Sequence, residues 1–197
     1  MNKNSYCVIM AGGLGKRFWP ESTRACPKQF CDILNVGKSF LRQTFERANQ
    51  IFDTQNIFIG TAYEELTKQQ IPEIPSENIL KEPFGKNTAP CVAYAAYRIA
   101  RVNPHASMVV VPSDHFITND AVYLDNIQKG ISFVEQFGGL LTIGINPTRP
   151  ETGYGYIQIK KNKFSEFISK VKTFTEKPDK ELAKVFLESG DFLWNAG

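Results

Sequence analysis

The sequence has 197 residues, of which 42% are hydrophobic and 22% charged, and its formal net charge at pH 7 is +3. This balance is ordinary for a soluble globular protein and excludes a polybasic arm, since no block of like charge exceeds a few residues. No segment approaches the ~20 apolar residues that span a bilayer. We therefore expect a cytoplasmic protein with free thiols that binds neither nucleic acid nor a membrane.

The first part of the chain alternates strand-like with helix-like segments. Residues 6–10 are apolar and run into glycines, which predicts a buried strand. Ser39 is expected to cap a helix that continues to about Phe52, because the apolar residues of this segment share one face. Residues 56–61 and, more weakly, 77–83 predict two further strands.

The alternation continues to about residue 145. Residues 88–102 and 120–137 predict helices, and the segments 107–115 and 139–145 predict strands. A repeated strand–helix alternation implies an α/β, Rossmann-like fold, in which a mostly parallel sheet carries helices on both faces.

After Asn146 the pattern changes. Residues 154–159 and 167–178 are strand-like with polar alternation, and they predict an antiparallel ribbon near the C-terminus. Residues 180–188 predict a helix, and residues 191–197 begin another strand. No internal repeat or clear linker separates this part from the rest.

Small residues and two cations follow the first strand, namely Ala11, Gly12, Gly13, Gly15, Lys16 and Arg17. Glycine permits positive φ and lets backbone N–H groups approach a ligand closely. Such amides bind phosphate oxygens, and neighbouring cations add to the attraction. In a doubly wound sheet ligands lie beyond the carboxyl ends of the strands. The loop therefore predicts a polyphosphate site.

Two similar patterns are excluded. The glycine spacing is not that of a dinucleotide-binding GxGxxG loop, which argues against a dehydrogenase. "GKS" at residues 37–39 ends like a phosphate loop, but Asp32 stands where that motif needs its first glycine. A turn before the helix capped by Ser39 is the favoured interpretation of this segment.

Asp114 follows the strand-like segment "VVVP" and is expected near the same edge of the sheet. A carboxylate beside phosphates is repulsive unless it holds Mg²⁺, a hard cation that prefers oxygen ligands and substrate phosphates. Taken alone, an Asp after Pro-Ser is more typical of a turn than of a metal site.

Six motifs occur in the order found in the sugar-phosphate nucleotidyltransferases: "AGGLGKRFWP…PKQF", "KNTAP", "PSDH", "GYGYI", "FTEKP" and "WNAG". The Trp-Pro pair, PKQF and KNTAP most resemble the mannose-1-phosphate guanylyltransferases, over residues 8–197. The resemblance implies a GT-A-like nucleotidyltransferase domain that transfers GMP from GTP to mannose 1-phosphate with Mg²⁺ as cofactor. It also implies a homodimer, since the family is commonly dimeric.

The resemblance also implies roles for individual residues. The expected catalytic residues are Arg17, Lys28 and Asp114, of which Asp114 is the metal ligand. The expected nucleotide-binding residues are Ala11, Gly12, Gly13, Gly15, Lys16, Asn87 and Thr88. The expected sugar-phosphate-binding residues are Gly153, Gly155, Glu176, Lys177 and Asn195. No role is assigned to His115, Cys26 or Cys31.

The chain departs from the family in a few places. Lys16 stands where threonine is usual, Thr23 where arginine is frequent, and Ala196 where the family has serine. The family places a second metal-binding aspartate beyond this last motif, so residues 1–197 are expected to be an incomplete catalytic domain with little activity by itself. A uridylyl- or thymidylyltransferase acting on glucose 1-phosphate and a non-catalytic nucleotide-sugar-binding module remain as alternatives.

Overall fold

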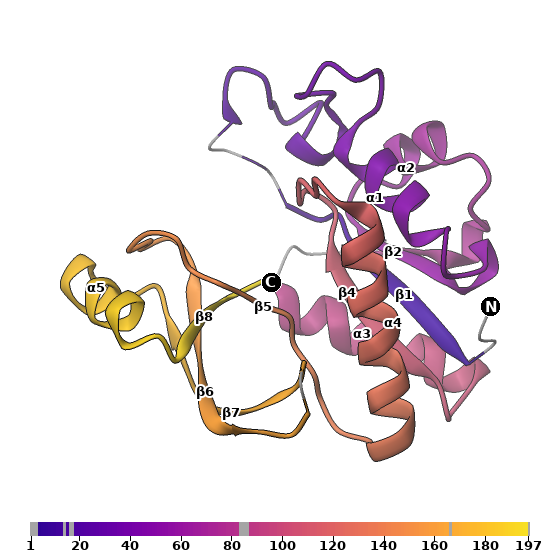
Figure 1. Cartoon of the computed structure of the whole chain (residues 1–197). Helices are drawn as coiled ribbons and strands as arrows, with labels where there is room; N and C mark the ends of the chain where they lie inside the picture. The colour runs from indigo at the N-terminus through magenta and orange to yellow at the C-terminus, as the bar shows by residue number, and fades with distance from the viewer. Residues whose placement is uncertain (1–3, 14, 16–17, 83–86, 166, 197) are drawn as a thin grey trace. The chain divides into compact units, whose positions relative to one another are not determined.

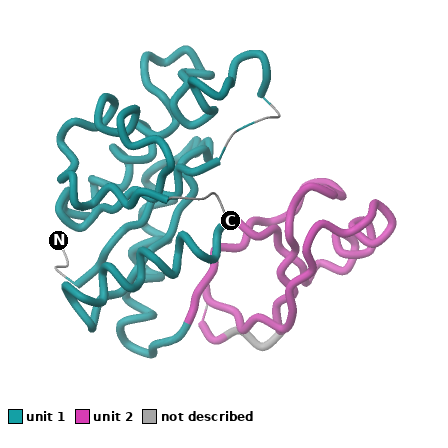
Figure 2. The backbone as a smooth tube through the Cα atoms, turned by 180° about the vertical axis from the view of Figure 1, so that it is seen from behind, with its two compact units in different colours: residues 1–139 teal, residues 140–197 magenta. Residues whose placement is uncertain are grey.

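The computed structural model describes residues 4–13, 15, 18–82, 87–165 and 167–196, without the side chains of residues 161–163. The chain divides into two compact units, Met1–Gly139 and Leu140–Gly197, shown in different colours in Figure 2. Within the described residues, no helix combines the length and the apolar character that crossing a membrane requires.

The first unit is built on a four-stranded parallel sheet with the strand order β3-β2-β1-β4 (Figure 1). Its strands are β1 (Ser5–Met10), β2 (Ile57–Thr61), β3 (Ile79–Lys81) and β4 (Ser107–Pro112). β1 is central and almost entirely buried, as expected for an apolar run between two parallel neighbours. The α/β fold predicted from the alternation is confirmed.

Helices cover both faces of this sheet (Figure 1). On one face, α3 (Thr88–Val102) packs Ala95 and Ile99 against Tyr6 and Val8 of β1. The opposite face is covered by α1 (Phe40–Ala48) and α4 (Asp120–Phe137), which contact β1 and β4 respectively. Successive β1 side chains thus pack into two separate apolar layers, one on each face of the sheet, because side chains alternate between the faces along a strand.

Local signals explain the start of α1. Ser39 Oγ accepts a hydrogen bond from the Arg42 backbone N–H over 3.1 Å, which confirms the predicted cap. The Asp32 carboxylate accepts from the N–H groups of Val36 and Gly37, so "GKS" belongs to a turn rather than a phosphate loop. The regular helix ends at Ala48, earlier than predicted.

Several short elements were not predicted. They are α2 (Glu64–Gln70) and the 3-10 helices η2 (Lys28–Phe30), η3 (Thr54–Asn56) and η4 (Ser76–Asn78). Of these, η2 matters most here, because it carries part of the PKQF motif.

The second unit is an antiparallel sheet of four strands in the order β5-β8-β6-β7. Its elements are β5 (Gly144–Ile145), β6 (Gly155–Lys163), β7 (Ser169–Glu176), α5 (Lys180–Ser189) and β8 (Phe192–Asn195). The predicted ribbon is confirmed as β6 and β7. On one face of the sheet, α5 contributes Ala183 and Phe186 to a core with Tyr156, Phe192 and Trp194.

The strand predicted at residues 139–145 is the one element whose placement was wrong. Only Gly144 and Ile145 form a strand, and they pair antiparallel with Asn195 and Trp194 instead of extending the parallel sheet. A Cβ on Gly144 would lie 2.5 Å from Leu193 Cδ1, so the glycine permits this close approach. A short apolar run carries no information about which sheet it joins.

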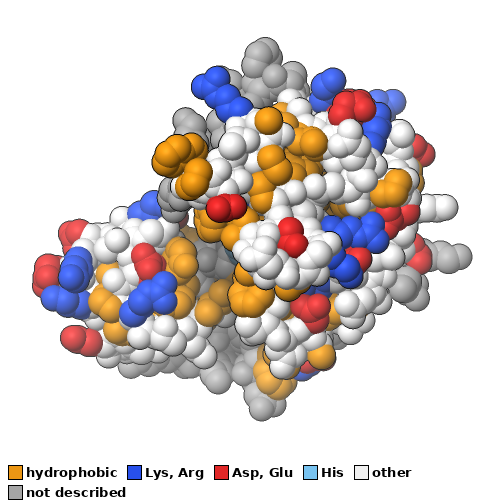
Figure 3. Space-filling view, turned by 90° about the horizontal axis from the view of Figure 1, so that it is seen from above, with side chains coloured by type: hydrophobic (Ala, Val, Ile, Leu, Met, Phe, Trp, Pro, Cys, Tyr) orange, Lys and Arg blue, Asp and Glu red, His pale blue; other side chains and the backbone are white. Residues whose placement is uncertain are grey.

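On the face shown in Figure 3, the Lys and Arg side chains of the described residues are interspersed with Asp and Glu side chains and with apolar ones. This arrangement agrees with the small formal net charge of +3.

Candidate functional site

The glycine loop begins where β1 ends. The Ala11 N–H donates to the Gly60 carbonyl oxygen over 2.7 Å, which continues the pairing of β1 with β2 for one residue. Gly15 has a φ of 61°, and a Cβ at this position would lie 2.5 Å from Lys28 Cβ. Gly15 is therefore required both by its backbone conformation and by the close approach of the PKQF segment.

Gln29 holds this loop in place and was not singled out from the sequence. Its side chain is 3% exposed, and Nε2 donates to the carbonyl oxygens of Ala11 over 2.7 Å and of Gly13 over 2.9 Å. The two amide hydrogens thus pair with carbonyl oxygens that are buried or partly buried, and leaving these oxygens without a hydrogen bond would destabilise the fold. The only signal in the sequence was its place inside PKQF.

Lys28 and Asp114 form an ion pair beside the loop. Lys28 Nζ lies 3.1 Å from Asp114 Oδ2, and the two side chains are 17% and 40% exposed. Asp114 stands two residues after the end of β4, so the pair lies at the carboxyl ends of the strands. The Lys28 ammonium also lies 4.2 Å from the centre of the Phe18 ring, which adds a cation–π contact.

The residues present fit a magnesium ion held mainly by substrate oxygens. No group of three or more His, Cys, Asp or Glu side chains within the described ranges could form a complete metal site. Asp114, partly exposed at the strand end, offers one carboxylate. Mg²⁺ is usually bound by one or two carboxylates together with phosphate oxygens and water. Asp114 would provide one of these carboxylates.

Two of the expected phosphate ligands, Lys16 and Arg17, lie outside the described residues. Gly12, which is described, faces the Glu82 side chain, because a Cβ on Gly12 would lie 3.1 Å from Glu82 Oε1. Among the described residues, leaving out its chain neighbours, no atom lies within 4 Å of the Cβ position of Gly13. The described part of the loop is therefore tight at Gly12 and Gly15.

Asn87 and Thr88 are both exposed where α3 begins. Asn87 occupies the N-cap position with a φ of 67°, yet its side chain makes no capping hydrogen bond. The side-chain oxygen of an N-cap asparagine ordinarily accepts a hydrogen bond from a backbone N–H in the first turn of the helix. Within the described residues, the Asn87 amide makes no such bond to the first turn of α3.

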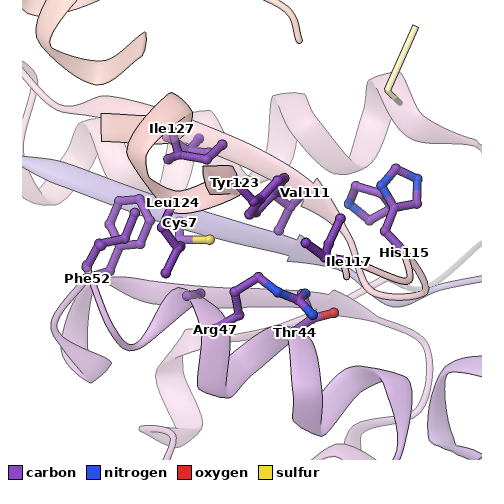
Figure 4. Close-up of a pocket in the computed structure, with 14 residues that line it drawn as sticks. Cys7, Thr44, Arg47, Phe52, Val111, His115, Ile117, Tyr123, Leu124 and Ile127 are labelled. Atoms are coloured by element: carbon purple, nitrogen blue, oxygen red, sulfur yellow. The ribbon is translucent and has the colours of Figure 1, made fainter. Parts of the chain in front are cut away.

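His115 follows Asp114 and lies at one end of an internal cavity of about 20 Å³ between α1, α4 and the sheet (Figure 4). Burial lowers the pKa of His115, and the Asp114 carboxylate opposes this only in part. A cavity of this volume holds about one water molecule. It is therefore too small for a nucleotide, and His115 is a largely buried neighbour of the site.

In the second unit, three of the expected sugar-binding residues converge. The β6–β7 register places Gly155 opposite Glu176, and a Cβ on Gly155 would lie 2.7 Å from Glu176 Oε2. The same Cβ would lie 3.6 Å from Asn195 Cβ on β8. Directly opposed residues of an antiparallel pair share one face, so the Glu176 carboxylate lies over the glycine, in the space that a side chain at position 155 would occupy, with Asn195 beside it.

The other two expected sugar-phosphate ligands adjoin this cluster. Lys177 has a φ of 44°, and its Nζ lies 2.6 Å from Glu176 Oε1. Gly153 is exposed and donates its N–H to Glu151 Oε1 over 3.0 Å. This hydrogen bond, together with Arg149, lowers the pKa of Glu151. Both units thus contain expected site residues.

Comparison with known proteins gives concordant matches. A family model described as "Nucleotidyl transferase" matches residues 6–197. A mannose-1-phosphate guanylyltransferase of Escherichia coli is 38% identical over 195 residues. The xanthan biosynthesis protein XanB of Xanthomonas campestris is 39% identical over 197 residues. A solved Thermus thermophilus structure, named mannose-1-phosphate geranyltransferase, has a TM-score of 0.85 at 28% identity.

The matches cover nearly all of this chain and a smaller share of each relative. The two curated relatives are matched over 96% of this chain, which corresponds to 41% and 40% of their own lengths. The Thermus thermophilus structure is matched over 98% of this chain and 56% of its own. This chain therefore spans less than half the length of the curated relatives it matches.

Proposed function

This chain belongs to the nucleotidyl transferase family, and we propose that it is part of an enzyme that transfers GMP from GTP to mannose 1-phosphate, giving GDP-mannose and pyrophosphate. The observation that carries the proposal is the Lys28–Asp114 pair beside the glycine loop. At one edge of the parallel sheet, Lys28 offers a cation that can bind a phosphate, Asp114 offers a carboxylate that can bind Mg²⁺, and the glycine loop lets a ligand come close to the backbone. The relatives named guanylyltransferases support the choice of nucleotide and sugar.

The reaction needs charge neutralisation more than acid–base chemistry. An oxygen of the sugar phosphate attacks the α-phosphorus of GTP, and the bond from that phosphorus to the bridging oxygen breaks as pyrophosphate leaves. A phosphate monoester has a second pKa near ~6, so the attacking group is already mostly dianionic at neutral pH. The main barrier is the approach of two polyanions, which positioned cations and dipoles lower.

The residues of the first unit suit this task. Gln29 fixes the carbonyl groups of Ala11 and Gly13, which orients the loop whose N–H groups would bind the triphosphate. Lys28 would exchange its contact with Asp114 for a phosphate oxygen, and Asp114 would hold Mg²⁺. The bound metal ion would offset the charge on the triphosphate. Arg17 and Lys16 retain the phosphate-binding role that the sequence suggests.

The second unit would bind the sugar phosphate. Glu176 lies over Gly155 with Asn195 beside it, and a carboxylate and an amide together can bind neighbouring sugar hydroxyls. Lys177 would bind the sugar phosphate, because its side chain is exposed and pairs with an exposed carboxylate at 2.6 Å. Such a surface ion pair is weak and easily exchanged.

The proposal is tested by measuring pyrophosphate release for each pairing of GTP, UTP or dTTP with mannose 1-phosphate or glucose 1-phosphate. The protein that contains this chain should be used, with and without Mg²⁺. We expect the GTP and mannose 1-phosphate pair to give the highest kcat/KM, and the release to require Mg²⁺. A preference for UTP or dTTP with glucose 1-phosphate would establish the other sugar nucleotidyltransferase, and no release with any pair would contradict catalysis.

A further inference from the structure

Two cysteines without an assigned role lie against each other beside the candidate site. The Sγ atoms of Cys26 and Cys31 are 3.1 Å apart, and both residues are free cysteines with partly exposed side chains. A disulfide has an S–S length of about 2.05 Å, so the two sulfur atoms are already in contact and about 1 Å from bonding distance. Cys7 and Cys91 are both buried.

The backbone between the two cysteines is already folded into a tight turn. The Thr23 N–H donates to the Cys26 carbonyl oxygen over 2.9 Å, and the Cys26 N–H donates back to Thr23 Oγ1 over 3.1 Å. The Cys31 N–H donates to the Lys28 carbonyl oxygen over 3.1 Å. Hydrogen bonds at both ends therefore keep the two thiols together.

We propose that Cys26 and Cys31 form a redox-active dithiol that a low-molecular-weight disulfide oxidises to an intramolecular disulfide, locking the turn that carries Lys28 and Gln29. These two residues lie between the cysteines in sequence, and they make the contacts to Asp114 and to the glycine loop. The inference concerns these thiols alone and stands whether or not the proposed reaction is correct.

The exchange is balanced as two thiol–disulfide steps. The Cys26 thiolate attacks one sulfur of the oxidant, forms a mixed disulfide and expels one thiolate, which takes up the proton that Cys26 lost. Cys31 Sγ then attacks Cys26 Sγ and expels the second thiolate, which takes up the proton of Cys31. Two protein thiols are oxidised and one small disulfide is reduced to two thiols.

The surroundings of Cys31 set this order of attack. Its Sγ lies 3.3 Å from the Cys26 carbonyl oxygen, 3.4 Å from that of Pro27 and 3.5 Å from that of Glu21. Desolvation, with the adjoining Cys26 and Glu21, raises the pKa of Cys31 to about 12. Cys31 is thus protonated at neutral pH when Cys26 attacks the oxidant, and it acts second, on the Cys26 sulfur that lies 3.1 Å from its own.

Peptide mapping tests the proposal, because trypsin cleaves after Lys28 and so separates the two cysteines. The chain is treated with glutathione disulfide or with dithiothreitol, blocked with iodoacetamide under denaturing conditions and digested. We expect the oxidised sample to contain peptides 25–28 and 29–38 joined by a disulfide that dithiothreitol releases. In the reduced sample the same peptides should be separate and each alkylated.

Matched variants identify the pair. Cys26→Ser and Cys31→Ser should each abolish the linked peptides, whereas Cys91→Ser should leave them unchanged. Under native conditions, cleavage after Lys28 should be roughly tenfold slower in the oxidised chain, since proteolysis requires local opening that the cross-link restricts. Stable glutathione adducts on separate cysteines, disulfides between chains, or equal cleavage rates before and after oxidation would each overturn the proposal.

Discussion

Lys28 and Asp114, 86 residues apart in sequence, meet through an ion pair of 3.1 Å between Nζ and Oδ2. The pair joins the turn after the glycine loop to the turn after β4. Partly exposed ion pairs contribute only about 0–1 kcal/mol, so a phosphate can displace Asp114 from Lys28 at little cost. Without substrate, each residue holds the other near the position that its proposed role requires.

Replacing Asp114 by asparagine tests the metal carboxylate. Asp114→Asn keeps the shape of the side chain and removes its charge. We expect Mg²⁺-dependent pyrophosphate release to fall by roughly 10²–10³-fold, the usual effect of losing one electrostatic group at a reaction centre, with a nearly unchanged melting temperature. Asp125→Asn is the matched control, because Asp125 pairs with Lys129 on the exposed side of α4. Near-normal turnover of Asp114→Asn would refute the assignment.

Gln29→Glu tests the clamp on the glycine loop. The substitution replaces an amide that donates to two carbonyl oxygens with a group of the same shape that, when ionised, only accepts. We expect a loss of about 1–3 kcal/mol in the free energy of unfolding, together with weaker binding of GTP. Chemical denaturation and calorimetry measure the two effects.

The pH dependence of the same variant gives a second measurement. Burial raises the folded-state pKa of the introduced carboxyl above its unfolded value. The protonated carboxyl can still donate one hydrogen bond, so the loss of stability should be smallest near pH 4 and grow as pH rises. Gln43→Glu is the control, since Gln43 donates to the Lys38 carbonyl oxygen at an exposed position. Equal, pH-independent effects of the two substitutions would contradict the clamp.

Regular segments of the fold were predictable because periodicity and caps are local signals. The bounds 88–102 and 120–137 match α3 and α4, and the Ser39 cap starts α1 as expected. The partner of residues 139–145 was not predictable, because the choice between two sheets depends on contacts with β8, distant in sequence. α2 is only seven residues long and has one buried residue, so it carries little periodic signal.

The candidate site was predictable only as a set of motifs. Resemblance pointed to Lys28, Asp114, Gly155, Glu176 and Asn195, and the structure groups them within their respective units. Gln29 was not selected, because glutamine is typically exposed and its burial depends on carbonyl groups that only the folded loop presents. The contact between Cys26 and Cys31 was likewise invisible, since five residues of spacing do not fix a turn.

Gly155→Ala tests the position of the Glu176 carboxylate over Gly155. The new methyl group would lie 2.7 Å from Glu176 Oε2, so the carboxylate must move away. We expect a higher KM for mannose 1-phosphate and a modest loss of stability. In the double variant Gly155→Ala with Glu176→Ala the stability should be regained, because the clashing atoms are absent, while the KM should stay high. Thermal unfolding and steady-state kinetics separate the two readouts, and an unchanged KM in both variants would show that the position of Glu176 over Gly155 has no role in sugar binding.

Asn87→Gly tests base recognition with little disturbance of the fold. Asn87 has a φ of 67° and no capping hydrogen bond within the described residues, so glycine suits its backbone and the substitution removes the side-chain amide. If that amide binds the guanine edge, the variant should lose about 1–3 kcal/mol of GTP affinity, roughly five- to 150-fold, and bind UTP and dTTP as before. Asn35→Gly is the matched control, because Asn35 is also exposed with a positive φ of 52°. Calorimetry with the three nucleotides measures these affinities. Equal affinity of the unaltered protein for GTP, UTP and dTTP would exclude Asn87 as the base-reading residue. Equal GTP affinity of the Asn87→Gly and Asn35→Gly variants would exclude it as well.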